Sequence, residues 1–149
     1  MRKLLLTIAL LGSGFDAVAF ADCTTENVAG TYGYVGLGTI TSANPFGLPA
    51  GDYSSVGTLV FDGKGDLLIT DTARSGDYFL TPNATYESTY SVDRQCVGTF
   101  TIARFVSFGI PGPHYKLVFV DNRKGIRAIS LIRGWIVNYT NTTRTEGSN

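Results

Sequence analysis

The residue type best suited to acid–base chemistry occurs once in this sequence, at His114. Histidine acts as a general acid or base only with a positioned partner, and no Glu or His stands at ligand spacing from His114. A single histidine also cannot form a zinc site, and no Ser lies in a Gly-x-Ser-x-Gly nucleophile elbow. The sequence therefore leaves any catalytic residue unknown, and His114 is interpreted as a loop residue that enters a strand.

The segment from Asp62 to Asp66, Asp-Gly-Lys-Gly-Asp, looks like the start of a calcium-binding loop. It lacks the further oxygen ligands and the Glu at position 12 that hold the ion. A tight hairpin turn explains each of its residues, so we predict no metal. Gly36-Leu37-Gly38 has no third glycine and no following helix, which argues against a dinucleotide site. We predict no cofactor.

Aromatic side chains are the informative group. Apolar walls with a few polar groups are what a small-molecule pocket needs. The rings either line such a pocket or merely plug the protein interior, and both states occur in small barrels. The candidate ligand-binding residues are Phe46, Tyr53, Tyr78, Phe79, Phe105, Phe108, His114, Tyr115 and Trp135.

The elements that would position these residues are strands. Short alternating runs bounded by turn residues recur, and no segment keeps a helical period for three turns. Asp-Gly followed by a second Gly at position 65 is typical of a tight hairpin. The eight predicted strands are 30–40, 56–61, 67–70, 85–92, 97–105, 115–120, 126–133 and 135–139.

The connections between these strands alternate in length. Those after strands 2, 4 and 6 are tight, whereas 41–53, 73–84 and 106–114 are long. If neighbouring strands pair in sequence, all long loops share one end of the sheet. The aromatic rings of these loops, Phe46, Phe79 and Phe108 among them, are then expected to gather over a common rim.

Eight sequential strands leave two open edges unless the last pairs with the first. We therefore predict an all-β fold, an eight-stranded antiparallel up-and-down meander barrel that is lipocalin-like, with a two-sheet sandwich as the alternative. Tyr86 to Val92, Tyr115 to Phe119 and Ile126 to Ile132 supply predicted inward faces. Outward positions of the sixth and seventh strands are also apolar, so a loop, a partner subunit or lipid is expected to cover them.

The first residues predict export. Arg2 and Lys3 precede an apolar run of about a dozen residues, too short to span a membrane, and Ala-Phe-Ala ends at Ala21. We expect a signal peptide over 1–21, a barrel domain over 22–139 and a flexible polar tail over 140–149. The localisation is then secreted or periplasmic, and two cysteines in an exported chain are most often a disulfide, here Cys23 with Cys96.

Charge patterning excludes some partners. Removal of residues 1–21 takes away two of 12 basic and one of 12 acidic side chains, which leaves a net charge of −1. No run of like charge remains, so neither nucleic acid nor an anionic membrane surface is expected as a partner. The mature form is expected to have no membrane span, although a small outer-membrane barrel stays an alternative. A small apolar molecule and a homo-oligomer are the partners that remain.

Several motifs carry a resemblance. They are Gly30-Thr31-Tyr32-Gly33-Tyr34, Val56 to Gly65 (VGTLVFDGKG), Thr89-Tyr90-Ser91-Val92, Cys96-Val97-Gly98-Thr99, and the hairpin from Asp121 to Arg127. With them the chain resembles a widespread group of secreted bacterial β-barrel proteins without assigned function. The likeness covers most of the mature chain. It differs in two places: Gln95 stands where group members usually have Asp just before the second Cys, and the segment from Trp135 onward differs from the group's usual ending. Gly30-Thr31-Tyr32 is also similar to the Gly-x-Trp that opens lipocalin-like barrels.

Three functions compete. The first is a secreted or periplasmic barrel that binds a small hydrophobic or aromatic ligand at its long-loop end. The second is a cofactor-independent cyclase or isomerase that uses His114, Asp77 or Glu87 as acid or base, which predicts an enclosed ionisable group. The third is a structural or surface protein that forms oligomers through its two-sided strands.

Overall fold

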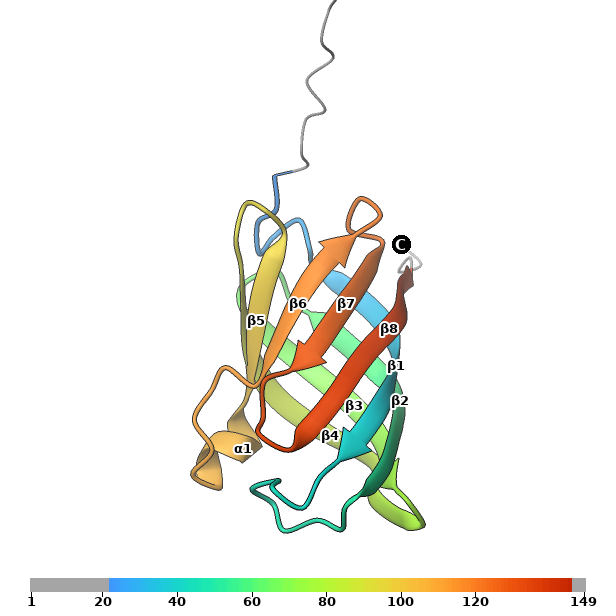
Figure 1. Cartoon of the computed structure of the whole chain (residues 1–149). Helices are drawn as coiled ribbons and strands as arrows, with labels where there is room; N and C mark the ends of the chain where they lie inside the picture. Colours follow the sequence, from blue (N-terminus) through green and yellow to red (C-terminus); the bar gives the residue numbers. More distant parts are fainter. Residues whose placement is uncertain (1–21, 146–149) are drawn as a thin grey trace, which may run out of the picture.

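The computed structural model describes residues 22–145, so the predicted signal peptide lies outside the described residues. Eight antiparallel strands follow one another in chain order and close into a barrel, because β8 pairs with β1. Figure 1 shows the closed wall and one short helix at its lower end. The elements are β1 (Gly30–Ile40), β2 (Gly51–Phe61), β3 (Asp66–Ser75), β4 (Tyr78–Val92), β5 (Val97–Ile102), α1 (Ala103–Ser107), β6 (Tyr115–Val120), β7 (Gly125–Ser130) and β8 (Trp135–Thr145).

The strands alternate between a buried and a solvent-facing side. In β3, Leu67, Ile69, Ala73 and Ser75 are buried, while Leu68 and Arg74 are exposed. A period of two is the pattern that a pleated strand imposes when one face lines a core. The predicted inward faces of β4, β6 and β7 follow the same rule. The barrel prediction is therefore confirmed, and the two-sheet sandwich is not adopted.

The β2–β3 turn shows how local chemistry fixes one end of the barrel. The Asp62 carboxylate accepts three backbone hydrogen bonds, from the N–H groups of Lys64 (2.7 Å), Gly65 (3.0 Å) and Asp66 (2.9 Å). These hydrogen bonds lower the pKa of the Asp62 carboxyl group, and the bond from Lys64 has the largest effect. Gly63 and Gly65 have positive φ values of 83° and 117°, which residues with a side chain rarely adopt. The segment is a hairpin turn, as predicted.

A disulfide closes the same end. Cys23 and Cys96 are bonded with 5.0 Å between their Cα atoms and a sequence separation of 73, which confirms the predicted pair. A loop of this length gives a stabilisation of about 4 kcal/mol in the chain-entropy treatment. The bond holds the segment before β1 against the β4–β5 turn, where the Cys23 N–H also donates to the Arg94 carbonyl.

That N-terminal segment caps an aromatic cluster. The Tyr32 hydroxyl donates to the carbonyls of Val28 (3.1 Å) and Arg123 (3.0 Å). The Tyr90 hydroxyl donates to the Thr25 carbonyl at 3.0 Å. Beneath the cap, the rings of Tyr32, Phe61, Tyr90 and Phe119 pack edge to face, with centroids 4.8–5.9 Å apart. This end of the barrel is filled with side chains.

The opposite end carries the longer connections, as the alternation of loop lengths predicts. Figure 1 shows the β1–β2 loop, α1 and the β7–β8 connection together at the lower end, away from the N-terminal segment. One predicted long loop is wrong, however. Residues 73–84 continue β3 and β4 as a paired hairpin with Ser75 opposite Tyr78, and only Gly76 and Asp77 form the turn.

Other predicted boundaries also differ. β2 begins at Gly51, inside the predicted loop 41–53, and β7 ends at Ser130 instead of Arg133. The fifth strand ends at Ile102 instead of Phe105, and the chain then turns into α1, where the Ser107 hydroxyl donates to the Arg104 carbonyl. β8 runs to Thr145 and pairs with β1 and β7 beyond the predicted domain end at Tyr139. Residues 140–145 are therefore strand, and 146–149 lie outside the described residues. Within the described chain, no helix has the length and hydropathy to cross a membrane.

Candidate functional site

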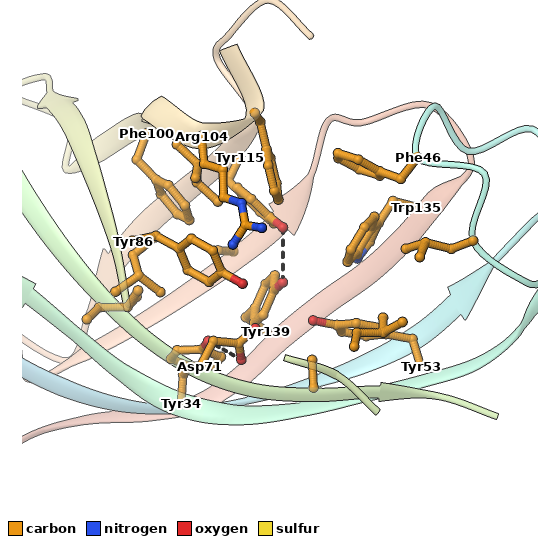
Figure 2. Close-up of a pocket in the computed structure, with 18 of the residues that line it drawn as sticks. Tyr34, Phe46, Tyr53, Asp71, Tyr86, Phe100, Arg104, Tyr115, Trp135 and Tyr139 are labelled. Atoms are coloured by element: carbon orange, nitrogen blue, oxygen red, sulfur yellow. Dashed lines mark hydrogen bonds between the residues drawn. The ribbon is translucent and has the colours of Figure 1, made fainter. Parts of the chain in front are cut away.

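A cavity of about 480 Å³ occupies the half of the barrel nearest the long loops. Its walls come from the inward faces of all eight strands, from the β1–β2 loop and from α1. It reaches inward to Leu59, two residues before the end of β2, and to Ile69, the fourth residue of β3. Its volume falls within the range of small-molecule sites, 300 to about 1,000 Å³. Figure 2 shows the aromatic rings around this space.

Six of the nine candidate ligand-binding residues line this cavity. Near the mouth, the Phe46 ring lies edge-on to Trp135 with centroids 5.2 Å apart and contacts Phe105 at 4.8 Å. Tyr53 packs edge-on to the other side of Trp135 at 5.2 Å. The six residues are Phe46, Tyr53, Phe105, Phe108, Tyr115 and Trp135.

Tyr78 and Phe79 do not reach the cavity. They stand at the start of β4, where Ser75 pairs with Tyr78 and Arg74 with Phe79. Their side chains are 62% and 74% exposed. The sequence placed them in a long loop that would fold over the mouth, but the loop is a hairpin arm. The predicted gathering of Phe79 with Phe46 and Phe108 therefore does not occur at the cavity wall.

His114 also lies outside the cavity lining, in a structural position. It is almost fully buried, and the backbone N–H of Ile102 donates to its Nδ1 at 2.9 Å. Nδ1 is thus the acceptor, so Nε2 carries the hydrogen and donates to the Ile110 carbonyl at 3.0 Å. Both ring nitrogens are used to fix the connection between α1 and β6. The other two residues considered for acid–base work, Asp77 and Glu87, are exposed and do not line the cavity.

The cavity contains polar groups that sequence reasoning did not select. Figure 2 shows the Tyr34 hydroxyl against Asp71, where it donates to Oδ1 at 2.7 Å. The Tyr139 hydroxyl donates to the Tyr115 hydroxyl at 3.3 Å. Tyr86 completes a set of five tyrosines that face the same space as Asp71.

The sequence does contain a signal for Asp71. It continues the inward alternation of Leu67 and Ile69, so it places a carboxylate on an otherwise apolar face. The predicted strand ended at residue 70, which removed this position from consideration. Tyr34 and Tyr86 follow from the same alternation in their own strands.

Gly36 gives Tyr139 its place in the wall. A Cβ at Gly36 would lie 2.6 Å from Tyr139 Cε1 and 2.5 Å from Ser55 Oγ, closer than real side-chain carbons approach one another. The absence of a side chain lets the Tyr139 ring lie over β1, with its centroid 5.3 Å from that of Tyr34. A glycine on the inward face of β1 therefore shapes the cavity.

Burial sets the protonation of these tyrosines. Removal from water raises the pKa of Tyr34, Tyr53, Tyr115 and Tyr139 above the ordinary value of 10.0. The negative charge of Asp71 raises the pKa of Tyr34 further, and it does the same at Tyr53 and Tyr115. The four hydroxyls stay protonated at neutral pH and serve as hydrogen-bonding groups.

Arg104 brings a positive charge to the mouth of the cavity. It stands on α1, and its guanidinium carbon lies 5.8 Å from the Tyr86 ring centroid and 5.6 Å from that of Phe108. The predicted fifth strand, 97–105, included Arg104. In the structure that strand ends at Ile102, and α1 brings Arg104 to the cavity lining instead.

One buried donor in the cavity wall, Trp135 Nε1, has no hydrogen-bond partner among the described residues. A buried donor without a partner costs about 1–3 kcal/mol. Across residues 22–145 no group of three or more His, Cys, Asp or Glu is arranged to hold a metal ion.

Comparison with other proteins adds no further assignment. No protein-family model, no curated protein and no solved structure matches this chain. The resemblance to secreted bacterial barrels and to lipocalin-like proteins stays a prediction from the motifs.

Proposed function

We propose that this protein is an exported barrel that binds one small, apolar or aromatic molecule in the cavity at its long-loop end. The observation that carries the proposal is the division of the interior. One half is filled by the Tyr32, Phe61, Tyr90 and Phe119 rings, while the other half encloses about 480 Å³. The sequence left open whether the aromatic rings plug the interior or line a pocket. Rings fill the end near the disulfide, and the cavity lies at the long-loop end.

The disulfide supports the exported location. Structural disulfides persist in secreted and periplasmic proteins and are rare in reducing compartments. Cys23 is 2% exposed and its bond is part of the cap over the filled end. An oxidising compartment is therefore the environment in which this barrel is stable, which agrees with the predicted signal peptide.

A neutral hydrophobic dye tests the proposal. We expect N-phenyl-1-naphthylamine to bind with one-to-one stoichiometry and to change the fluorescence of Trp135, the only tryptophan in the chain. In Ala128→Phe, a ring added to the β7 wall occupies part of the cavity, so dye affinity is expected to fall at least about tenfold, the equivalent of 1.4 kcal/mol. Isothermal titration calorimetry gives the stoichiometry independently.

The matched control removes apolar surface outside the barrel. Val56 is 57% exposed on the outward face of β2, so Val56→Ser is expected to leave dye binding unchanged. Equal binding by Ala128→Phe and wild type, or loss of binding in Val56→Ser, would show that the dye sits on the outer surface. Either result contradicts the proposal.

Two other functions are distinguished by simple measurements. An enzyme that acts without a cofactor now needs Asp71, because His114, Asp77 and Glu87 lie outside the cavity lining. Mass spectrometry of recovered ligand separates it from a binding protein, which returns the ligand unchanged. A structural oligomer would use the outer apolar residues Ile129 and Leu131, which are 48% and 47% exposed. Light scattering that gives a monomer ends that hypothesis.

A further inference from the structure

We propose that the cavity selects organic cations, an ammonium group on an apolar body, with the charged nitrogen beside Asp71 and among the faces of the surrounding tyrosines. The inference rests on the proposed function and specifies its ligand class. It requires a negative charge inside the cavity, aromatic faces around that charge and a reason to disfavour anions. Each requirement is met by different residues.

The negative charge lies on the inner wall. Asp71 stands on the inward face of β3 between Ile69 and Ala73, both of which are buried and line the same cavity. A carboxylate among apolar atoms loses hydration, and a cation placed next to it restores part of the lost energy. The hydrogen bond that the Tyr34 hydroxyl donates at 2.7 Å fixes the Oδ1 position at the wall.

The field of this carboxylate extends across the cavity. Besides burial, the charge of Asp71 raises the pKa of Tyr34 on β1, Tyr53 on β2 and Tyr115 on β6. The three hydroxyls come from opposite parts of the wall. A negative potential that disfavours tyrosinate at three places in the cavity favours a cation in the space between them.

The walls offer aromatic faces at the right spacing. A cation is attracted to an aromatic face within about 6 Å of the ring centroid, and the attraction grows when water is excluded. One such contact already exists, because the Arg104 guanidinium carbon lies 5.8 Å from the Tyr86 centroid. One ring of this tyrosine wall, Tyr86, thus already contacts a cationic side chain of the protein. The wall also contains Tyr34, Tyr53, Tyr115 and Tyr139.

Arg104 does not make the cavity a site for anions. It is exposed at the mouth, where solvent and salt screen its charge, whereas Asp71 lies in the wall. An anion deep in the cavity would face the Asp71 carboxylate and tyrosine ring faces, both of which repel it. Figure 2 shows the Arg104 side chain entering from α1 beside the Tyr86 ring, with Asp71 at the far edge of the ring cluster next to Tyr34.

Three probes with one phenyl body separate the charges. They are 2-phenylethylammonium, 2-phenylethanol and phenylacetate, titrated calorimetrically into the disulfide-bonded protein at pH 7. We expect the ammonium ion to bind about tenfold more tightly than the alcohol, the scale of a desolvated cation–π and charge interaction, and phenylacetate to bind most weakly.

Paired variants locate the effect. Asp71→Asn removes the inner charge and is expected to weaken ammonium binding about tenfold while phenylethanol changes less than about twofold. Glu87→Gln makes the same change of charge on the exposed face of β4 and is expected to leave all three affinities unchanged. Circular dichroism of both variants checks that the barrel forms. If a variant does not fold, the comparison of the three probes on the wild-type protein still tests the cation selectivity.

The outcomes separate this inference from the proposed function. If phenylethanol or phenylacetate binds as tightly as the ammonium ion, the cation selectivity is contradicted and the ligand-binding cavity stands. Tightest binding of phenylacetate, lost in Arg104→Ala, would assign the site to anions instead. If none of the probes and no neutral dye binds, both proposals fail.

Discussion

Each buried tyrosine hydroxyl brings a polar atom into the barrel, and such atoms are tolerated when they find a partner. The Tyr34 hydroxyl on β1 donates to Asp71 on β3, and the Tyr139 hydroxyl on β8 donates to the Tyr115 hydroxyl on β6. At the scale of single residues, the cavity is therefore an aromatic wall in which these four polar groups are held in two hydrogen-bonded pairs.

This arrangement predicts a loss of stability at alkaline pH. The native pKa of Tyr34, Tyr53, Tyr115 and Tyr139 lies above the unfolded value of about 10. Below pH 10 these tyrosines are protonated in both the folded and the unfolded protein, and their contribution to the free energy of unfolding is fully present. Above it the unfolded chain ionises first, so the free energy of unfolding falls by about 1.4 kcal/mol per pH unit for each tyrosine.

Guanidinium unfolding curves at pH 7, 10 and 11 measure this dependence, and absorbance at 295 nm reports tyrosinate. Tyr34→Phe is expected to reduce the slope above pH 10 by one proton. Stability that does not change between pH 10 and 11, or ionisation of these tyrosines while the barrel stays folded, would contradict the burial that we describe.

Sequence reasoning was effective for side chains whose direction follows from alternation. The inward positions of Tyr86, Tyr115 and Ala128 were predicted in this way, and all three are buried. Asp71 was missed because the predicted strand ended one residue too early, and Arg104 because α1 replaces the end of the predicted fifth strand. Both errors arise at strand ends, where pairing with a neighbour decides the boundary and local sequence does not.

At the scale of the strand, β1 is made unusual by its glycines. Gly36 admits the Tyr139 ring, and Gly38 allows β8 to approach β1 closely. A Cβ at Gly38 would lie 2.7 Å from Val137 Cα and closer still to the Ile136 carbonyl oxygen. The closing pair of the barrel therefore depends on the absence of a side chain at this position.

The pair of variants Gly38→Ala and Gly33→Ala tests this dependence. Gly38→Ala forces the β1–β8 pair apart and is expected to lower the free energy of unfolding by at least about 2 kcal/mol. Gly33 has open space where its Cβ would lie, so Gly33→Ala is expected to be neutral or slightly stabilising. Urea unfolding measures both, and equal stability of the two variants would contradict the close approach at Gly38.

The elements predicted from turn chemistry were the most accurate. The Asp-Gly turn at 62–65 and the turns after β4 and β6 stand where expected. Glycines at 63 and 65, and Asp121 and Asn122, are residue types that tolerate the positive φ values found there. The β3–β4 turn was missed since Thr72 to Phe79 contains only one glycine and little alternation in hydropathy. Its pairing is set by β2 and β4 on either side, which local sequence does not report.

At the scale of the whole molecule, the two ends of the barrel differ in structure: one is closed and filled, and the other holds the cavity. The disulfide, the N-terminal segment and four packed rings close one end. At the other end, loops and α1 frame the cavity without filling it. The sequence predicted which connections share each end, because successive turns of a meander must alternate. It could not predict how far the aromatic rings fill the interior, since that depends on how their volumes pack.

Two-dimensional ¹H–¹⁵N NMR of the protein titrated with 2-phenylethanol tests this division most directly, because the probe is neutral and independent of the charge selectivity. We expect shift changes at Tyr34, Trp135 and Ala128 around the cavity, and none at Tyr32 and Phe61 in the filled end. Changes confined to exposed positions such as Val56 and Ile136, or no saturable change at all, would contradict a ligand-binding cavity in this barrel.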